Sequence, residues 1–138
     1  MVALAAALLL RILVVVAFPP AFLVSDGPTY LGFVDRLVPS PDRPVGYGVL
    51  LRVLSWATRS VALVSATQLV LGLATALLAY VLLRRWGVPS WVATLATLPL
   101  LFDPLQLLLE HTVLSDVLFG FLVMLAVAVL AWWHVPRL

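Results

Sequence analysis

The amino-acid sequence predicts an all-α polytopic membrane protein with about four transmembrane helices. Hydrophobic residues make up 64% of the 138 positions and charged residues only 10%. The mean hydropathy of +1.20 lies well outside the range of soluble domains. Four apolar runs follow one another, bounded by charged, aromatic or turn-forming residues. We therefore expect one transmembrane helical domain over residues 1–138.

The composition also narrows the classes of function. The chain has no cysteine, which excludes disulfides, thiolate catalysis and cysteine-based metal sites. The sequence pI is about 9.7, but the net charge is only +2 and the arginines are dispersed. We therefore expect no nucleic-acid partner, and the lipid bilayer is the partner that the composition predicts.

The first span is expected at residues 3–24, with Arg11 inside it and Pro19-Pro20 near its end. A secretory signal peptide is the competing interpretation. It would need a basic segment before the apolar core and a small-residue cleavage site after it, and this sequence has neither. The run is therefore expected to be a retained helix.

The other spans are expected at residues 61–83, 88–102 and 112–133. The second is followed by "RRWG", and arginines beside a tryptophan are typical of a membrane boundary. The third is short and contains Pro99. The fourth ends in a tryptophan pair, as expected at a headgroup interface.

Residues 25–60 are expected to form a loop with short interfacial helices. A first helix is predicted from Gly27-Pro28 to Leu37, with Ser25 or Asp26 as its N-cap. An amphipathic helix is predicted from Pro44 to Arg59, lying in the membrane interface. Its polar side is formed by Arg52, Ser55 and Arg59.

A second polar cluster, "DPLQLLLEHTVLSD", follows the third span on the same side of the membrane. A helix beginning at Pro104 would place Asp103, Gln106 and Glu110 on one face. Asp103 also has a simple role as the N-cap of that helix.

Three side chains of this cluster are harder to assign. Carboxylates at a membrane boundary are costly unless they face water or a partner, so Glu110 and Asp116 are functional candidates. His111 is either a metal ligand or a hydrogen-bonded interfacial residue. Asp26 is likewise either a cap or a functional acid.

Several short motifs together carry a resemblance to a known family. Asp26 is followed by Tyr30, then come "RPVGYGVLLRVL", "LLRRWG" and "LLFDPLQLLLEHTVLSDVLF". This pattern resembles the N-terminal part of GT-C glycosyltransferases, in the branch of the protein mannosyltransferases and the enzymes that add aminoarabinose to lipid A. The resemblance covers nearly the whole chain.

The resemblance implies an inverting transfer from a polyprenyl-phosphate sugar donor, on the extracytoplasmic side of a bacterial plasma membrane. Arginine counting alone leaves the orientation undecided. The resemblance places the first loop outside, and Arg84 and Arg85 in the cytoplasm. By position, Asp26 matches the family's catalytic acid, a general base towards an acceptor hydroxyl.

The resemblance also suggests binding residues. Arg43 would pair with the donor phosphate, because a guanidinium offers forked donors to phosphate oxygens. Glu110 and Asp116 would orient the acceptor or hold a divalent cation, the one cofactor expected. The substrate-binding candidates are Tyr30, Arg43, Tyr47, Glu110, His111 and Asp116.

The chain also departs from the family pattern. It has Ser25-Asp26 where many relatives have an acidic doublet, and Pro44-Val45 where they have a double proline. Family members are several times longer, so the chain is expected to be an N-terminal fragment that is inactive alone. The alternative is a small non-catalytic four-helix membrane protein, either a remnant or an accessory subunit. The sequence leaves the oligomeric state open.

Overall fold

The computed structural model describes residues 2–24, 26–38, 43 and 45–134. These described residues form helices and connecting segments, with no strand, and Phe22 and Thr112 form an isolated bridge. The prediction of an all-α membrane protein is confirmed. The helices are α1 (Val2–Ala17), α2 (Gly27–Gly32), α3 (Val45–Ser55), α4 (Val61–Arg85), α5 (Ser90–Phe102), α6 (Pro104–Glu110) and α7 (Asp116–His134). Ser25, Pro44 and Arg137 lie outside the described residues.

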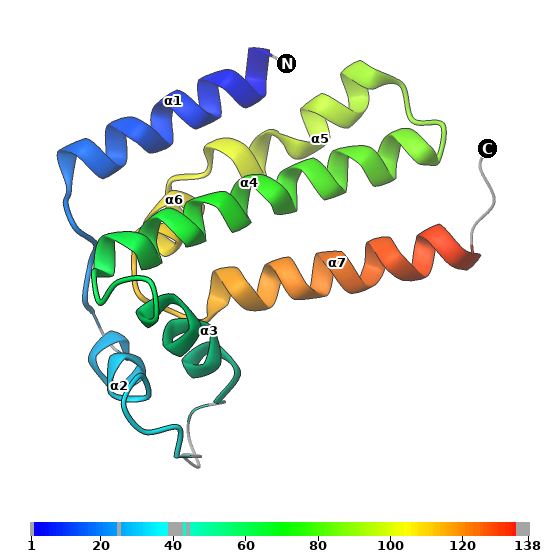
Figure 1. Cartoon of the computed structure of the whole chain (residues 1–138). Coiled ribbons are helices and arrows are strands. Elements are labelled where there is room, and N and C mark those ends of the chain that lie inside the picture. The colour runs from blue at the N-terminus through cyan, green and yellow to red at the C-terminus, as the bar shows by residue number, and fades with distance from the viewer. Residues whose placement is uncertain (1, 25, 39–42, 44, 135–138) are drawn as a thin grey trace.

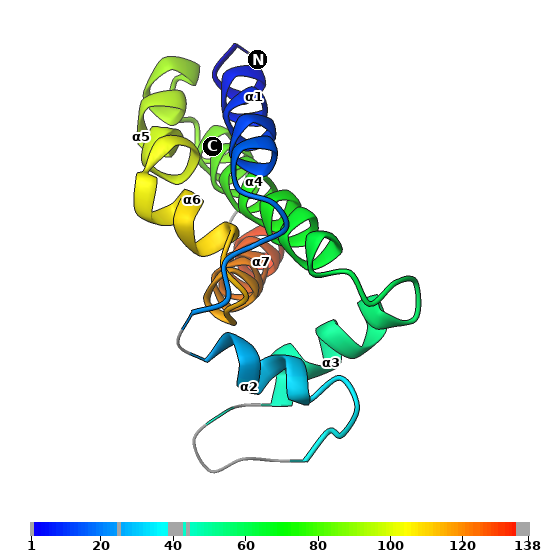
Figure 2. The same ribbon diagram turned by 90° about the vertical axis from the view of Figure 1, so that its left-hand side faces the viewer.

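The long helix α4 is the centre of the bundle. It packs against α1, α5, α6 and α7, which lie along it in Figure 1. Helices α2 and α3 lie together at the end where α1 finishes and where α4 and α7 begin, as Figures 1 and 2 show. The N-terminus and the α4–α5 connection lie at the opposite end. The structure therefore separates a first-loop end, which carries α2 and α3, from an N-terminal end.

Two helices, Val61–Arg85 and Asp116–Trp133, are each long and apolar enough to cross a membrane. Helices α5 and α6 pass the same test as a pair, bent by 54° where Asp103 joins them. The third expected run thus continues beyond residue 102 as a second, short helix. The fourth expected span corresponds to α7. It begins at Asp116 and not at residue 112, because residues 111–115 form a turn.

Helix α1 is shorter than the expected first span. Its 16 residues rise about 24 Å at 1.5 Å per residue, against about 30 Å for a hydrocarbon core. It ends at Ala17, although the sequence prediction ran to residue 24. Pro19 and Pro20 lack the backbone N–H that would continue the helical hydrogen bonds. The apolar residues that follow continue as an irregular segment.

The first-loop helices are also shorter than predicted. Helix α2 ends at Gly32, well before Leu37. Helix α3 ends at Ser55, whose hydroxyl donates to the carbonyl of Arg52 at 2.7 Å, so Arg59 lies outside it. Side chains that satisfy nearby backbone groups favour such helix ends.

A small apolar core joins these two helices to the bundle. It consists of Tyr30, Phe33, Tyr47, Leu51, Val64 and Val113. Gly48 allows the close approach of α3 to α2, because a Cβ there would lie only 2.8 Å from the Cβ of Phe33. Helices α2 and α3 are therefore packed against the bundle.

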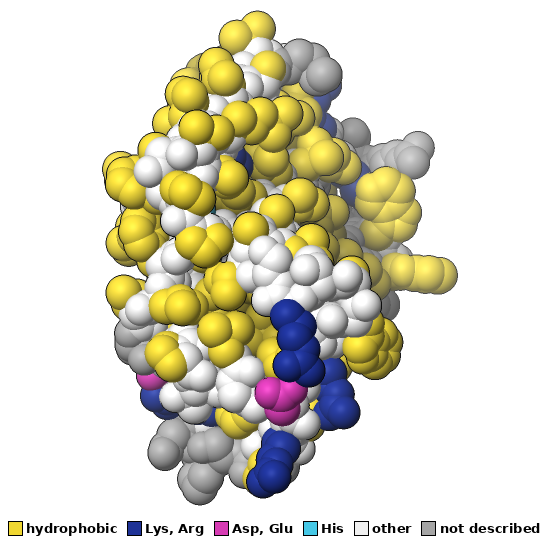
Figure 3. Space-filling view, turned by 60° about the vertical axis from the view of Figure 1, so that its left-hand side comes forward, with side chains coloured by type: hydrophobic (Ala, Val, Ile, Leu, Met, Phe, Trp, Pro, Cys, Tyr) yellow, Lys and Arg dark blue, Asp and Glu magenta, His cyan; other side chains and the backbone are white. Residues whose placement is uncertain are grey.

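The outer surface agrees with a membrane environment. Figure 3 shows hydrophobic side chains over most of one face, with several charged side chains gathered at the end that carries α2 and α3. Helix α7 exposes large apolar side chains along its length, including Phe119, Leu130 and Trp133. Exposed apolar area of this extent is typical of contact with lipid.

Candidate functional site

Two polar segments that are distant in the sequence meet at the first-loop end. The backbone N–H of Phe22 donates to the carbonyl of His111 at 2.8 Å, and the N–H of Val113 donates to the carbonyl of Phe22 at 3.1 Å. Nearby, the hydroxyls of Tyr30 and Ser115 are hydrogen-bonded at 3.1 Å. The first loop and the 111–116 segment therefore lie against each other.

Asp26 stands at the N-cap position of α2, but its side chain makes no capping hydrogen bond. Its carboxylate instead pairs with the guanidinium of Arg43. Both side chains are about one-third exposed. The structure thus leaves the Asp26 carboxylate reachable and beside a cation.

Asp103 behaves differently at the start of α6. Its carboxylate accepts a hydrogen bond from the backbone N–H of Leu105 at 2.8 Å. Its predicted role as a helix cap is therefore confirmed. Of the two aspartates that precede a proline-initiated helix, one caps its helix and the other forms an ion pair.

Tyr30 and Tyr47 pack together in the apolar core that joins α2 and α3 to the bundle. Their rings meet edge to face with centroids 5.0 Å apart, and both side chains are buried. The Tyr47 hydroxyl donates to Oε1 of Gln68 at 3.4 Å. Burial, with smaller contributions from Tyr30 and Asp116, raises the pKa of the Tyr47 phenol above its ordinary value. The phenol therefore stays neutral and acts as a hydrogen-bond donor.

Asp116 opens α7 and is exposed. A carboxylate in the first turn of a helix is stabilised by the helix dipole. Asp26 and Asp116 are thus the two accessible acids of the first-loop end that the sequence singled out.

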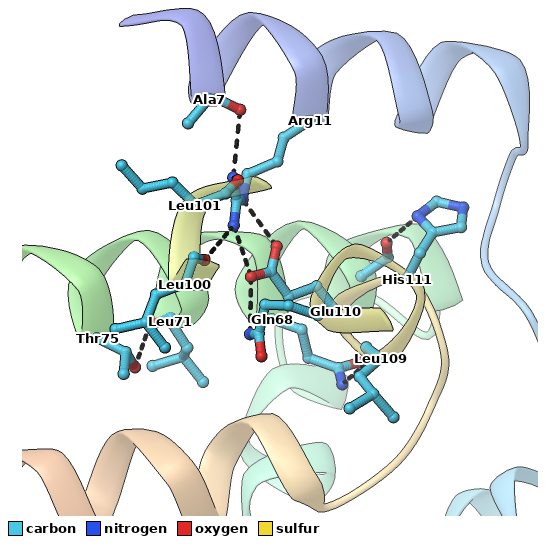
Figure 4. A network of polar contacts seen from close by, with 12 residues as sticks. Ala7, Arg11, Gln68, Leu71, Thr75, Leu100, Leu101, Leu109, Glu110 and His111 are labelled. Carbon is cyan, nitrogen blue, oxygen red and sulfur yellow. Dashed lines mark hydrogen bonds and ion pairs between the residues drawn. The ribbon is translucent and has the colours of Figure 1, made fainter. Parts of the chain in front are cut away.

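Glu110 lies elsewhere, in the interior of the bundle. Its side chain is 0% exposed, and its oxygens accept hydrogen bonds from Nε and Nη2 of Arg11, both at 2.7 Å. Gln106 donates to the same carboxylate at 2.9 Å. The sequence predicts Gln106 and Glu110 on one helix face, and the two side chains do meet. The Glu110 carboxylate faces Arg11 of α1 (Figure 4).

His111 is completely buried. One ring nitrogen, Nε2, contacts the carbonyl of Phe18, and Nδ1 lies 2.9 Å from the hydroxyl of Ser65. A carbonyl can only accept, so Nε2 is the donor of the first contact. Both nitrogens are engaged by the protein, as the hydrogen-bonded interpretation of His111 expects.

The described residues were expected to bind a divalent cation through Glu110 and Asp116. They contain no group of three or more histidine, aspartate or glutamate side chains that could bind one. Both oxygens of Glu110 already accept from Arg11. The cation expected from the sequence stays a prediction, and no chemical step below depends on it.

Sequence reasoning missed Arg11 and Gln68 as site-forming residues. Gln68 is completely buried, and its Nε2 donates to the carbonyls of Thr112 and Leu114 at 2.9 and 3.1 Å. It thereby ties α4 to the 111–115 turn and to Tyr47. The available signal was a polar residue inside an apolar run, which is costly unless it finds a partner.

Comparison with known proteins gives one match. A family model described as dolichyl-phosphate-mannose-protein mannosyltransferase matches residues 53–137, which is more than half of the chain. The matched range includes α4 to α6 and the 111–116 segment, whereas Asp26 and Arg43 precede it. No curated protein and no solved structure matches the chain.

Proposed function

Since the chain belongs to the dolichyl-phosphate-mannose-protein mannosyltransferase family, we propose that it forms the N-terminal part of an enzyme that transfers a sugar from a polyprenyl-phosphate donor to an acceptor hydroxyl. The transfer takes place at the first-loop end, outside the cytoplasm. Asp26 is the general base, and Arg43 is the group that receives the donor phosphate.

The contrast between Asp26 and Asp103 carries this proposal. Both precede a helix with proline in its first turn, yet only Asp103 uses its carboxylate as a cap. The Asp26 carboxylate is one-third exposed and pairs with Arg43. A reachable carboxylate beside a guanidinium suits a reaction that removes a proton and handles a phosphate.

The chemistry follows from these positions. Asp26 accepts the proton of the acceptor hydroxyl while the acceptor oxygen attacks the anomeric carbon. The bond from that carbon to the phosphate oxygen breaks, and the phosphate leaves with the electron pair. Direct displacement inverts the anomeric configuration. Arg43 stabilises the charge that develops on the leaving phosphate, because guanidinium groups bind phosphate through paired N–H donors.

The surrounding residues would orient the substrates. Tyr30 and Tyr47 support the site from the apolar core beneath it, and Asp116, exposed at the start of α7, offers a second acceptor for hydroxyl groups. Holding two substrates in reactive geometry supplies a large part of the rate enhancement of such reactions. The 111–116 segment would therefore serve to bind and orient the acceptor.

The proposed location is a bacterial plasma membrane, with the first loop extracytoplasmic. Arg84 and Arg85 lie at the other end of the bundle, where the Arg85 guanidinium stacks 4.3 Å above the Trp132 ring. Arginines and tryptophans at one membrane boundary support a cytoplasmic anchor there. The first-loop end and its acids would then face outward.

A transfer assay tests the function. Membranes carrying the chain, expressed from its complete reading frame, receive polyprenyl-phosphate mannose, polyprenyl-phosphate aminoarabinose or the corresponding nucleotide sugars. We expect sugar transfer only from a lipid-linked donor. Absence of transfer from every donor, with the protein present in the membrane, would favour the alternative of a non-catalytic membrane protein.

A further inference from the structure

We propose that the buried Arg11–Glu110 pair is a positioning device that holds the 111–115 turn against the first loop. In this account Glu110 contacts neither substrate nor metal ion. The part that concerns the catalytic site rests on the proposed function. The part that concerns the position of the turn stands on the structure alone and is tested separately.

The pair connects three parts of the chain that are distant in sequence. Arg11 donates two hydrogen bonds to Glu110, and its Nη1 donates to the carbonyl of Leu101 at 2.9 Å. Its Nη2 also donates to the carbonyl of Leu100 at 3.4 Å. One guanidinium thus joins α1 to the end of α5 and to the end of α6, as Figure 4 shows.

Glu110 is well placed to control the turn. It is the last residue of α6, and His111, which follows it, accepts the hydrogen bond from Phe22. Two positions further on, Val113 donates back to Phe22. Fixing the Glu110 side chain therefore fixes the start of the segment that packs against the first loop and presents Ser115 to Tyr30.

Helix α4 provides a space for the carboxylate. A Cβ at Gly72 would lie 1.9 Å from Oε1 and 2.4 Å from Cδ of Glu110. These distances are far below van der Waals contact, so any larger residue would displace the carboxylate from Arg11. Gly72, Arg11 and Gln106 together leave the Glu110 side chain one position.

Stability alone explains this arrangement poorly. A buried ion pair loses solvation on both sides, and well-packed apolar residues of similar size are often as stable or more so. A forked pair does provide a defined geometry, because two parallel hydrogen bonds fix both distance and orientation. Its two contacts of 2.7 Å at 0–1% exposure are suited to setting a position.

A cross-linking experiment measures that position directly. The chain has no cysteine, so Phe22→Cys and Thr112→Cys can be introduced together as a reporter. Paired residues of a β-bridge have the short Cα separation that a disulfide needs. The rate of disulfide formation in membranes then reports how closely the turn lies against the first-loop segment.

Gly72→Ala is the test variant, because it leaves both charges in place. Gly120→Ala is its matched control, since a Cβ at Gly120, also in a membrane helix, meets nothing within 4 Å. We expect Gly72→Ala to slow disulfide formation about tenfold and Gly120→Ala to leave it unchanged. Equal rates in the two variants would overturn the proposal.

Glu110→Gln decides the question if the Gly72→Ala protein does not accumulate. It keeps the size of the side chain and removes the charge that holds the forked pair. Slower cross-linking supports the positioning role, and an unchanged rate rejects it. The transfer assay is read in parallel. Slow cross-linking in a protein whose parent shows no transfer would retain the positioning role and reject the proposed function.

Discussion

Separating the Arg11–Glu110 pair should destabilise the bundle in a way that a double-mutant cycle can resolve. Arg11→Gln leaves a fully buried carboxylate with Gln106 as its remaining side-chain donor. Removing one partner of a buried ion pair costs about 3–5 kcal/mol in the free energy of unfolding. Glu110→Gln should cost less, about 1.5–3 kcal/mol, because Arg11 keeps the carbonyls of Ala7, Leu100 and Leu101 as acceptors.

The double variant should cost clearly less than the sum of the two single variants, since neither charge is then left alone. The free energy of unfolding is measured by titration with SDS in mixed micelles. The Arg59–Asp35 pair is the matched control, because its side chains are 78% and 68% exposed and such pairs contribute little. If the Arg11 and Glu110 effects add within about 0.5 kcal/mol, or match those of the control pair, the two side chains do not interact as described.

Three further predictions concern the ends of the helices and the first loop. Asp103→Ala should lower the free energy of unfolding by about 1 kcal/mol, because the helix loses its cap. Asp26→Ala should lack this capping loss. Equal decreases in the free energy of unfolding in an SDS titration would contradict the assignment of caps. Thr58→Cys should react with an impermeant thiol reagent on intact cells and Ser90→Cys only after lysis; the reverse pattern would invert the orientation. Because the pKa of Tyr47 is raised above its ordinary value of 10.0 in the folded state, the unfolded chain releases this proton first as the pH rises above about 10. Stability should therefore fall there, and Tyr47→Phe should lessen that fall. An identical alkaline profile for both proteins would argue against the buried phenol.

The sequence predicted the long helices well, because their signals are local. Helices α4 and α7 are long apolar runs that begin or end at polar or aromatic boundary residues, and such runs need no tertiary information to be recognised. The end of α1 was predicted less well. Apolar residues continue past Pro19-Pro20, so hydropathy alone predicts a longer helix. In the structure these residues form an irregular segment, in which Phe22 pairs with Thr112.

The polar residues show the limit of sequence reasoning more clearly. Glu110 was singled out because a carboxylate in an apolar region is costly without a partner, and the structure pairs it with Arg11. That partner, Arg11, lies 99 positions away, and only the packing of α1 against α5 and α6 brings the two together. Asp26 and Asp103 precede similar helix starts, so the sequence offered each the same two roles. The contact with Arg43 separates them.

The most direct test of the central claim is the rate of sugar transfer by the Asp26→Asn protein, measured beside Asp103→Asn. Asparagine keeps the size and much of the hydrogen bonding of aspartate but does not accept the proton. Transfer from the polyprenyl-phosphate donor should fall by roughly 10² to 10⁴ for Asp26→Asn at equal expression. It should stay near the parent rate for Asp103→Asn, because asparagine caps helices about as well as aspartate. Near-parental transfer by the Asp26→Asn protein would remove Asp26 from the role of general base.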